Sequence, residues 1–209
     1  RVFPGCQVYV MKNGKAVYDK CFGTYTYESK QPVTANTLYD LASLSKTTGT
    51  LFAIMKLYDS GKLKLTDRAS AYLTFLRGTD KENITIKDLL FHETGLPGSM
   101  FFYKALLEKN NTPSFLETDT LHTVRLNSST MKYKAGWTSK FKTIEYQAQV
   151  GDSFYMHNKF HDMAMQKIAA TKIGAKTYLY SCVNFILLKE VAEAISGISM
   201  DAFLERKGF

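Results

Sequence analysis

The sequence predicts an α+β fold, with strands at the front of the chain and a long helical section after them. Two segments suited to strands, residues 7–12 and 15–22, open the chain and are joined by Asn13-Gly14. That dipeptide is a strong signal for a two-residue hairpin turn. Later segments carry apolar residues at helical spacing. Strands followed by a run of helices are typical of the α+β class.

The register of this hairpin decides whether two of the three cysteines can pair. If Lys12 faces Lys15 in a regular ladder, Cys6 faces Cys21 at about 5.5 Å between Cα atoms, which is within disulfide range. A one-residue bulge would remove that pairing. We favour two buried free thiols over a bridge. The chain has no C-x-x-C pair, so a cysteine-rich zinc site is not expected.

Residues 24–39 are turn-rich, and a helix is predicted over residues 44–60, with Gly61 as a natural stop. The apolar residues at helical spacing in this segment are Leu44, Leu51, Met55 and Tyr58.

Further helices follow. Thr85, with Asp88 three residues later, predicts a capped helix that ends at the TGLPG turn. FHDMAMQKIAATK is helical in pattern, and NFILLKEVAEAIS predicts a helix ended by Gly197, with Ser199 capping the next one. No strand is evident after the hairpin, so the predicted sheet is incomplete in this chain.

Composition and charge exclude several classes of function. The chain has 209 residues, a net charge of +8 and 45% hydrophobic residues, as expected of a globular domain. No apolar run approaches the ~18 residues of a membrane span. The basic residues are scattered singly, without the cluster and module of a nucleic-acid-binding surface, so no nucleic-acid partner is expected.

Ser43 and Lys46, in the stretch DLASLSKTTGTLF, form a candidate catalytic pair. Serine is a weak nucleophile until a base removes its proton. Residues three apart share one face of a helix, so Lys46 can reach Ser43 there. Free N–H groups at a helix N-terminus can stabilise an oxyanion. The alternative is that Ser43 caps the helix and Lys46 is solvated. Two more S-x-x-K pairs, at 129–132 and 139–142, lie in polar segments.

A metal hydrolase is a rival interpretation. His157 and His161 are four residues apart, a spacing that can place two imidazoles on one metal ion. Asn158 stands where H-E-x-x-H has its glutamate, and no third ligand is obvious, so we expect no metal and no other cofactor. His92 is interpreted as a helix C-terminal residue, where a cation is favourable.

Tyr180, directly before the most clearly predicted helix, completes a recognisable order. With LASLSKTTGTLFAIMKLYDSGKLKLTD, ITIKDLLFHETGLP, YSCVNFILLKEVAEAISG and the opening hairpin, the chain resembles the serine beta-lactamase and penicillin-binding-protein superfamily, in its class C and esterase-like branch. The resemblance implies a beta-lactamase/transpeptidase-like fold, in which an antiparallel sheet packs against a helical lobe. It implies that Ser43 is acylated, that Lys46 accepts its proton, and that Tyr180 relays a proton to the leaving group or activates the deacylating water.

Two departures from the family pattern qualify the resemblance. Cys182 stands at the substrate-binding position that is usually Asn, and a thiol cannot replace the paired donor and acceptor of an amide; Asn184 is nearby in a shifted register. No Lys- or His-x-Gly strand follows Tyr180. We therefore expect residues 1–209 to be one truncated domain, with a hairpin and its approach over 1–40 and a helical lobe over 41–209 that carries a basic, aromatic insertion at about 99–179.

The predicted function is that of a serine hydrolase acting through an acyl-enzyme on an ester, an amide or a beta-lactam. Two alternatives stay open: a non-catalytic, ligand-binding relative, and a peptidase of the D-Ala-D-Ala carboxypeptidase type. The substrate is a small molecule or peptide, and the positive charge would suit one that bears a carboxylate. The chain shows no signal peptide, but the resemblance implies a periplasmic or secreted protein.

Overall fold

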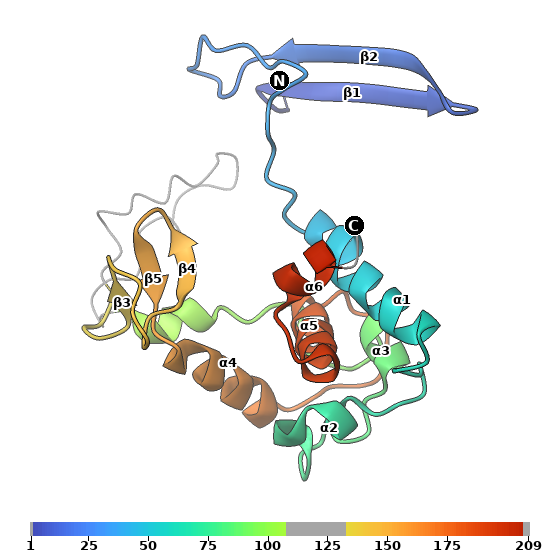
Figure 1. Cartoon of the computed structure of the whole chain (residues 1–209), viewed down its shortest axis with the longest axis vertical. Helices are drawn as coiled ribbons and strands as arrows, with labels where there is room; N and C mark the ends of the chain where they lie inside the picture. Colours follow the sequence, from blue (N-terminus) through green and yellow to red (C-terminus); the bar gives the residue numbers. More distant parts are fainter. Residues whose placement is uncertain (1, 108–132, 207–209) are drawn as a thin grey trace. The chain divides into compact units, whose positions relative to one another are not determined.

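The computed structural model describes residues 2–107 and 133–206. It divides into two compact units, Arg1–Leu44 and Ser45–Phe209. The first unit holds a β-hairpin, and the second holds the helices and a small second sheet (Figure 1). The S-x-x-K pair at 129–132 lies outside the described residues.

The opening hairpin is confirmed. Strands β1 (Gly5–Lys12) and β2 (Lys15–Gly23) pair antiparallel. Asn13 and Gly14 between them have φ values of 51° and 73°. Two successive left-handed residues match the right-handed twist of the flanking strands, and asparagine and glycine adopt that conformation at low cost.

The disulfide alternative is wrong, because the ladder slips by one residue between Val10 and Met11. Cys6 therefore faces Phe22, and Cys21 faces Gln7. Neighbouring residues on a strand point to opposite faces, so the two thiols lie on opposite faces of the hairpin. Both are free, as favoured, although they are half-buried and not fully buried.

The helix predicted over residues 44–60 is present, but its predicted apolar face is not the buried one. A π-helical segment, η1 (Lys46–Leu51), leads into α1 (Phe52–Asp59), and the chain turns away at Gly61 with φ 69°. Met55 is 53% exposed. The buried side chains are Ala53, Ile54 and Leu57. Two apolar stripes fit helical spacing here, and packing against the later helix α5 selects the second.

Short helices follow α1: α2 (Ala69–Tyr72), η2 (Thr74–Leu76), α3 (Ile86–Leu90) and η3 (Phe102–Leu106). The predicted capping box of α3 is confirmed. The Asp88 N–H donates to Thr85 Oγ1 at 3.1 Å, and the Thr85 N–H donates to Asp88 Oδ2 at 2.9 Å. Both N–H groups left unpaired at the helix start are thereby satisfied.

No strand after the hairpin is evident from the sequence, but three short strands are present among the described residues. Strands β3 (Thr138–Ser139), β4 (Ala148–Gly151) and β5 (Phe154–Met156) form an antiparallel sheet in the order β3-β5-β4. Each is two to four residues long. Such short strands are set by pairing across the sheet, because they are too short to show a sequence period.

Three helices complete the second unit: α4 (Lys159–Ala170), α5 (Cys182–Ser196) and α6 (Met200–Arg206). All three were predicted, and Gly197 ends α5 with φ 72°. Helix α5 lies centrally (Figure 1) and packs against α1, α2, α3 and α6. Its fully buried side chains include Val183, Leu187, Leu188 and Val191. Within the described residues, no helix is both long and apolar enough to cross a membrane.

Candidate active site

Ser43 lies in a tight turn at the end of the first unit. Asp40 Oδ1 accepts the N–H of Ala42 at 2.8 Å, and the N–H of Leu44 donates to the carbonyl of Leu41 at 2.8 Å. Ala42 has a left-handed φ of 43°, which costs a non-glycine residue about 1–2 kcal/mol. The chain therefore stores strain directly before the serine.

The second unit brings Lys46, Tyr180 and Cys182 together. Lys46 Nζ lies 5.5 Å from the centroid of the Tyr180 ring, within cation–π range. Burial lowers the pKa of Lys46, but hydrogen bonds to the Tyr180 and Cys182 side chains, with the attraction of both groups, raise it above the ordinary value. Lys46 therefore rests as an ammonium group.

The strand-like stretch that carries Tyr180 is fastened to the turn after α3. The N–H of Cys182, the first residue of α5, donates to the Gly98 carbonyl at 2.7 Å. The Ser181 hydroxyl donates to the Pro97 carbonyl at 2.7 Å. Gly98 leaves little space, because a Cβ there would stand 3.2 Å from the Tyr180 carbonyl. The TGLPG turn predicted from the sequence thus holds the backbone at and directly after Tyr180.

Asn184 is fully buried, one helical turn into α5. Its Oδ1 accepts the Thr94 hydroxyl at 2.8 Å, and its Nδ2 lies 3.2 Å from His92 Nδ1. Both ends of the amide are used within the protein. We therefore assign Asn184 to the support of the turn and not to a substrate-contacting surface, whereas the half-buried Cys182 thiol contacts Lys46.

His92 was expected to be a cation at the end of α3, and the structure corrects this. It follows the C-cap residue Phe91 with a left-handed φ of 57°. Its Nδ1 accepts the N–H of Ser181 at 3.1 Å. Burial and the charge of Lys46 lower the pKa of His92, so the ring is neutral near pH 7. The sequence motif located His92, but its role as a neutral hydrogen-bond acceptor comes from contact with Ser181, 89 residues along the chain.

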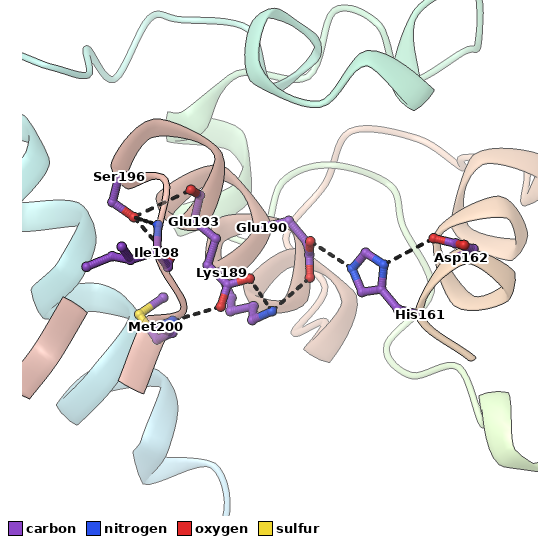
Figure 2. Close-up of polar contacts among 8 residues, drawn as sticks. All are labelled: His161, Asp162, Lys189, Glu190, Glu193, Ser196, Ile198 and Met200. Carbon is purple, nitrogen blue, oxygen red and sulfur yellow. Dashed lines mark hydrogen bonds and ion pairs between the residues drawn. The ribbon is translucent and has the colours of Figure 1, made fainter. Parts of the chain in front are cut away.

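The two histidines of the metal interpretation do not share a ligand site. His157 precedes α4 and accepts the N–H of Lys159 on Nδ1 at 3.0 Å. Figure 2 shows His161 between Glu190 on α5, at 2.9 Å, and Asp162, at 3.5 Å. Across residues 2–107 and 133–206, no three His, Cys, Asp or Glu side chains are grouped to hold a metal ion.

A hollow of about 950 Å³ lies away from Lys46 and Tyr180, beside β5, α4 and the α5–α6 corner. Its charged lining residues include Asp162, Lys189 and Glu193. Lys189 donates to Glu193 at 2.5 Å, and Glu193 also accepts the N–H of Met200 at 2.8 Å (Figure 2). Lys189 and Glu193 thus pair within α5, and Glu193 also links α5 to the start of α6, so both charges have partners within the protein.

The chain is similar to several known proteins. A profile of the Beta-lactamase family matches residues 1–209. An N-acetylmuramyl-L-alanine amidase of Bacillus subtilis (strain 168) is 26% identical over 98% of this chain and 40% of its own length. A beta-lactamase of Pseudomonas fluorescens is 44% identical over 44% of this chain and 26% of its own length. The crystal structure of a class C beta-lactamase in complex with cefoxitin superposes with a TM-score of 0.62 at 24% identity, covering 98% of this chain and 43% of the other. The chain thus spans less than half the length of these proteins.

Proposed function

The chain belongs to the Beta-lactamase family, and from that premise we propose that it acts as a serine hydrolase through an acyl-enzyme. The substrate is an ester, an amide or a beta-lactam. The observation that carries the proposal is the position of the Lys46 side chain against Tyr180 and Cys182, three residues after a serine. An exposed lysine with no such partners would instead favour a helix cap and a solvated side chain.

In the proposed reaction, Ser43 Oγ attacks the substrate carbonyl carbon while its proton passes to a neutral Lys46 Nζ. The oxyanion that forms is stabilised by the backbone N–H of Ser43. It then collapses, the bond to the leaving group breaks, and the leaving group takes a proton from the Lys46–Tyr180 pair. Water next attacks the acyl-Ser43 ester while its proton passes through Tyr180 to the neutral Lys46 Nζ. The tetrahedral intermediate then collapses, the bond between the acyl carbon and Ser43 Oγ breaks, and Oγ takes that proton back, which releases a carboxylic acid and free Ser43.

Cys182 bears on the choice of substrate. An amide at this position could donate to a substrate carbonyl and accept from an N–H, whereas a thiol is weak in both roles. Here the thiol is also hydrogen-bonded to Lys46. We therefore place small esters and peptides, including those of the D-Ala-D-Ala type, before beta-lactams. We also propose an extracytoplasmic location, because members of the Beta-lactamase family are often periplasmic or secreted.

A non-catalytic, ligand-binding protein is the second candidate, and the same Cys182 contact favours it. A Lys46 side chain tied to both a phenol and a thiol is held as an ammonium group, which cannot accept a proton from serine. This candidate predicts tight ligand binding with no covalent product.

Reaction with a fluorophosphonate probe separates the two candidates. The protein is incubated with the probe, and peptide mass spectrometry locates the adduct, with Ser43→Ala as the matched control. We expect an adduct on Ser43 that the control lacks. An adduct that persists in the control, or that lies on Ser139, would contradict the nucleophile assignment. A folded protein that gives no adduct on any serine would favour the non-catalytic candidate.

A further inference from the structure

His92 contacts four groups in and around the Tyr180 segment. Its ring centroid lies 4.7 Å from that of Tyr180 and 5.4 Å from that of Phe185. Its Nδ1 accepts the N–H of Ser181, the residue directly after Tyr180. The carbonyl of His92 accepts the N–H of Leu179, the residue directly before it, at 2.9 Å. One residue therefore holds the backbone on both sides of Tyr180 and also contacts its ring.

The hydrogen bonds fix the protonation state of the imidazole. A backbone N–H can only donate, so Nδ1 must carry a lone pair to accept from Ser181. The Asn184 amide is oriented independently, because Thr94 Oγ1 accepts the N–H of Leu96 and donates its own proton to Asn184 Oδ1. Asn184 Nδ2 is then the group that faces His92 Nδ1, and it donates. Two donors converge on Nδ1, so the neutral ring carries its proton on Nε2.

A neutral ring also suits the charge at this place. The Lys46 ammonium group stands over the Tyr180 ring, against which His92 packs. A protonated His92 would add a second positive charge beside Lys46 and would turn Nδ1 from an acceptor into a donor. Besides Lys46, the titratable groups that face the ring are the phenols of Tyr178 and Tyr180. None of the described contacts of His92 supplies a carboxylate that would favour the charged form.

We propose that His92 is the positioning residue for Tyr180: its neutral imidazole holds the backbone beside Tyr180 and braces the phenol ring so that the phenol meets Lys46. The consequence for reactivity rests on the proposed function, whereas the positioning itself does not. A phenol displaced by about 1 Å from its partner can cost about 100-fold in rate. The same displacement changes the folding free energy little, because Tyr180 is 44% exposed.

The test compares two variants of His92. Asn at this position tolerates a left-handed φ and its Oδ1 can accept from Ser181, but it has no ring to brace Tyr180. We expect His92→Asn to keep wild-type stability in urea while its rate of fluorophosphonate labelling falls about 10- to 100-fold. His92→Ala should lower both the stability in urea and the labelling rate. Glu93→Gln, an exposed isosteric change in the same turn, should leave both unchanged. If His92 only stabilised the fold, His92→Asn would match wild type in both labelling rate and stability, and that result would overturn the proposal.

Two further readouts separate failure of this inference from failure of the proposed function. Wild-type labelling should fall additionally on the acid side as His92 becomes protonated, and His92→Asn should lack that fall. Nitrogen-15 NMR of wild type at about pH 6, where an ordinary histidine is mostly charged, should show an unprotonated Nδ1. An unprotonated Nδ1 in a protein that never labels would overturn the hydrolase alone. A protonated Nδ1, or a labelled wild type matched in rate by His92→Asn, would overturn the positioning of Tyr180 alone.

Discussion

At the scale of single residues, the proposed chemistry depends on the protonation state of Lys46. The side chain that must accept a proton from Ser43 rests as an ammonium group, because its bonds to Tyr180 and Cys182 outweigh the effect of burial on its pKa. At pH values below the pKa of a lysine, its neutral fraction grows about tenfold for each unit by which the pH rises. The proposed mechanism therefore couples the reactivity of Ser43 to pH through Lys46.

The first prediction follows from this coupling. Between about pH 7 and pH 9, the rate of fluorophosphonate labelling at Ser43 should rise about tenfold for each pH unit. Lys46→Met removes the base and should give a slow rate that does not change with pH, and Lys46→Arg should behave in the same way because guanidinium stays charged. The measurement is the labelling rate by intact-protein mass spectrometry. A wild-type rate that is flat over this range would exclude Lys46 as the proton acceptor.

Buried polar residues around the TGLPG turn lead to the second prediction. Asn184→Leu would leave the Thr94 hydroxyl without its buried partner, at a cost of about 1–3 kcal/mol in the free energy of unfolding. Thr94→Val should cost a similar amount. The double variant should lose clearly less than the sum, because each single variant already removes the hydrogen bond between these two side chains. Urea denaturation of the four proteins measures this, and strict additivity would show that the two side chains do not interact.

At the scale of elements, what the sequence could predict depends on the range of the interaction. The Asn13-Gly14 turn, the Thr85–Asp88 capping box and the stop at Gly197 are set within a few residues, and all were readable. The bulge between Val10 and Met11 leaves no signal in the composition, so the pairing partners of the two cysteines could not be predicted from the sequence. The role of His92 depends on contacts with Ser181 and Asn184, which follow it by 89 and 92 positions in the chain. Hydrophobic periodicity cannot reveal contacts over that range.

The third prediction concerns the capping box of α3. Burial raises the pKa of Asp88, but the N–H of Thr85 and the ammonium group of Lys176 lower it by more than burial raises it. The folded pKa therefore lies below the unfolded value. Asp88 therefore stabilises the fold above about pH 4, and this contribution is lost as pH falls through the folded pKa. Asp88→Asn should cost about 1 kcal/mol at pH 7. The difference from wild type should shrink towards pH 3; a constant difference in urea denaturation would contradict a charge effect.

The fourth prediction concerns the corner between α5 and α6. Glu193 bonds Lys189 with one oxygen and the N–H of Met200 with the other (Figure 2). Glu193→Ala should lower the free energy of unfolding by about 1–3 kcal/mol, since it leaves both donors without this acceptor. Asp162→Asn is the control, because Asp162 is 77% exposed and 3.5 Å from His161; it should stay within about 0.5 kcal/mol of wild type. Equal effects in thermal denaturation would mean that the corner adds no stability of its own.

At the scale of the whole molecule, burial is distributed unevenly between the two units. The core is built from the second unit, with α5 at its centre. Among residues 2–44, Val33 and Thr37 are the buried side chains. The hairpin exposes apolar side chains such as Tyr9, Met11 and Val17. The sequence indicated both the strands and the helices, but a pattern of alternating residues does not reveal how much of a strand is buried.

Local stability should follow this distribution, which gives the fifth prediction. Opening free energy is low where few apolar contacts are buried and approaches the global value in a packed core. A two-stranded hairpin is marginal by itself, so amides of β1 and β2 should exchange with deuterium about 100-fold faster than those of Leu187 and Leu188 in α5. Hydrogen exchange followed by NMR at residue resolution measures both sets in one sample. Comparable protection in the hairpin and in α5 would mean instead that the two units open together as one cooperative body, in which case the Ser43 turn would share the stability of the helical core.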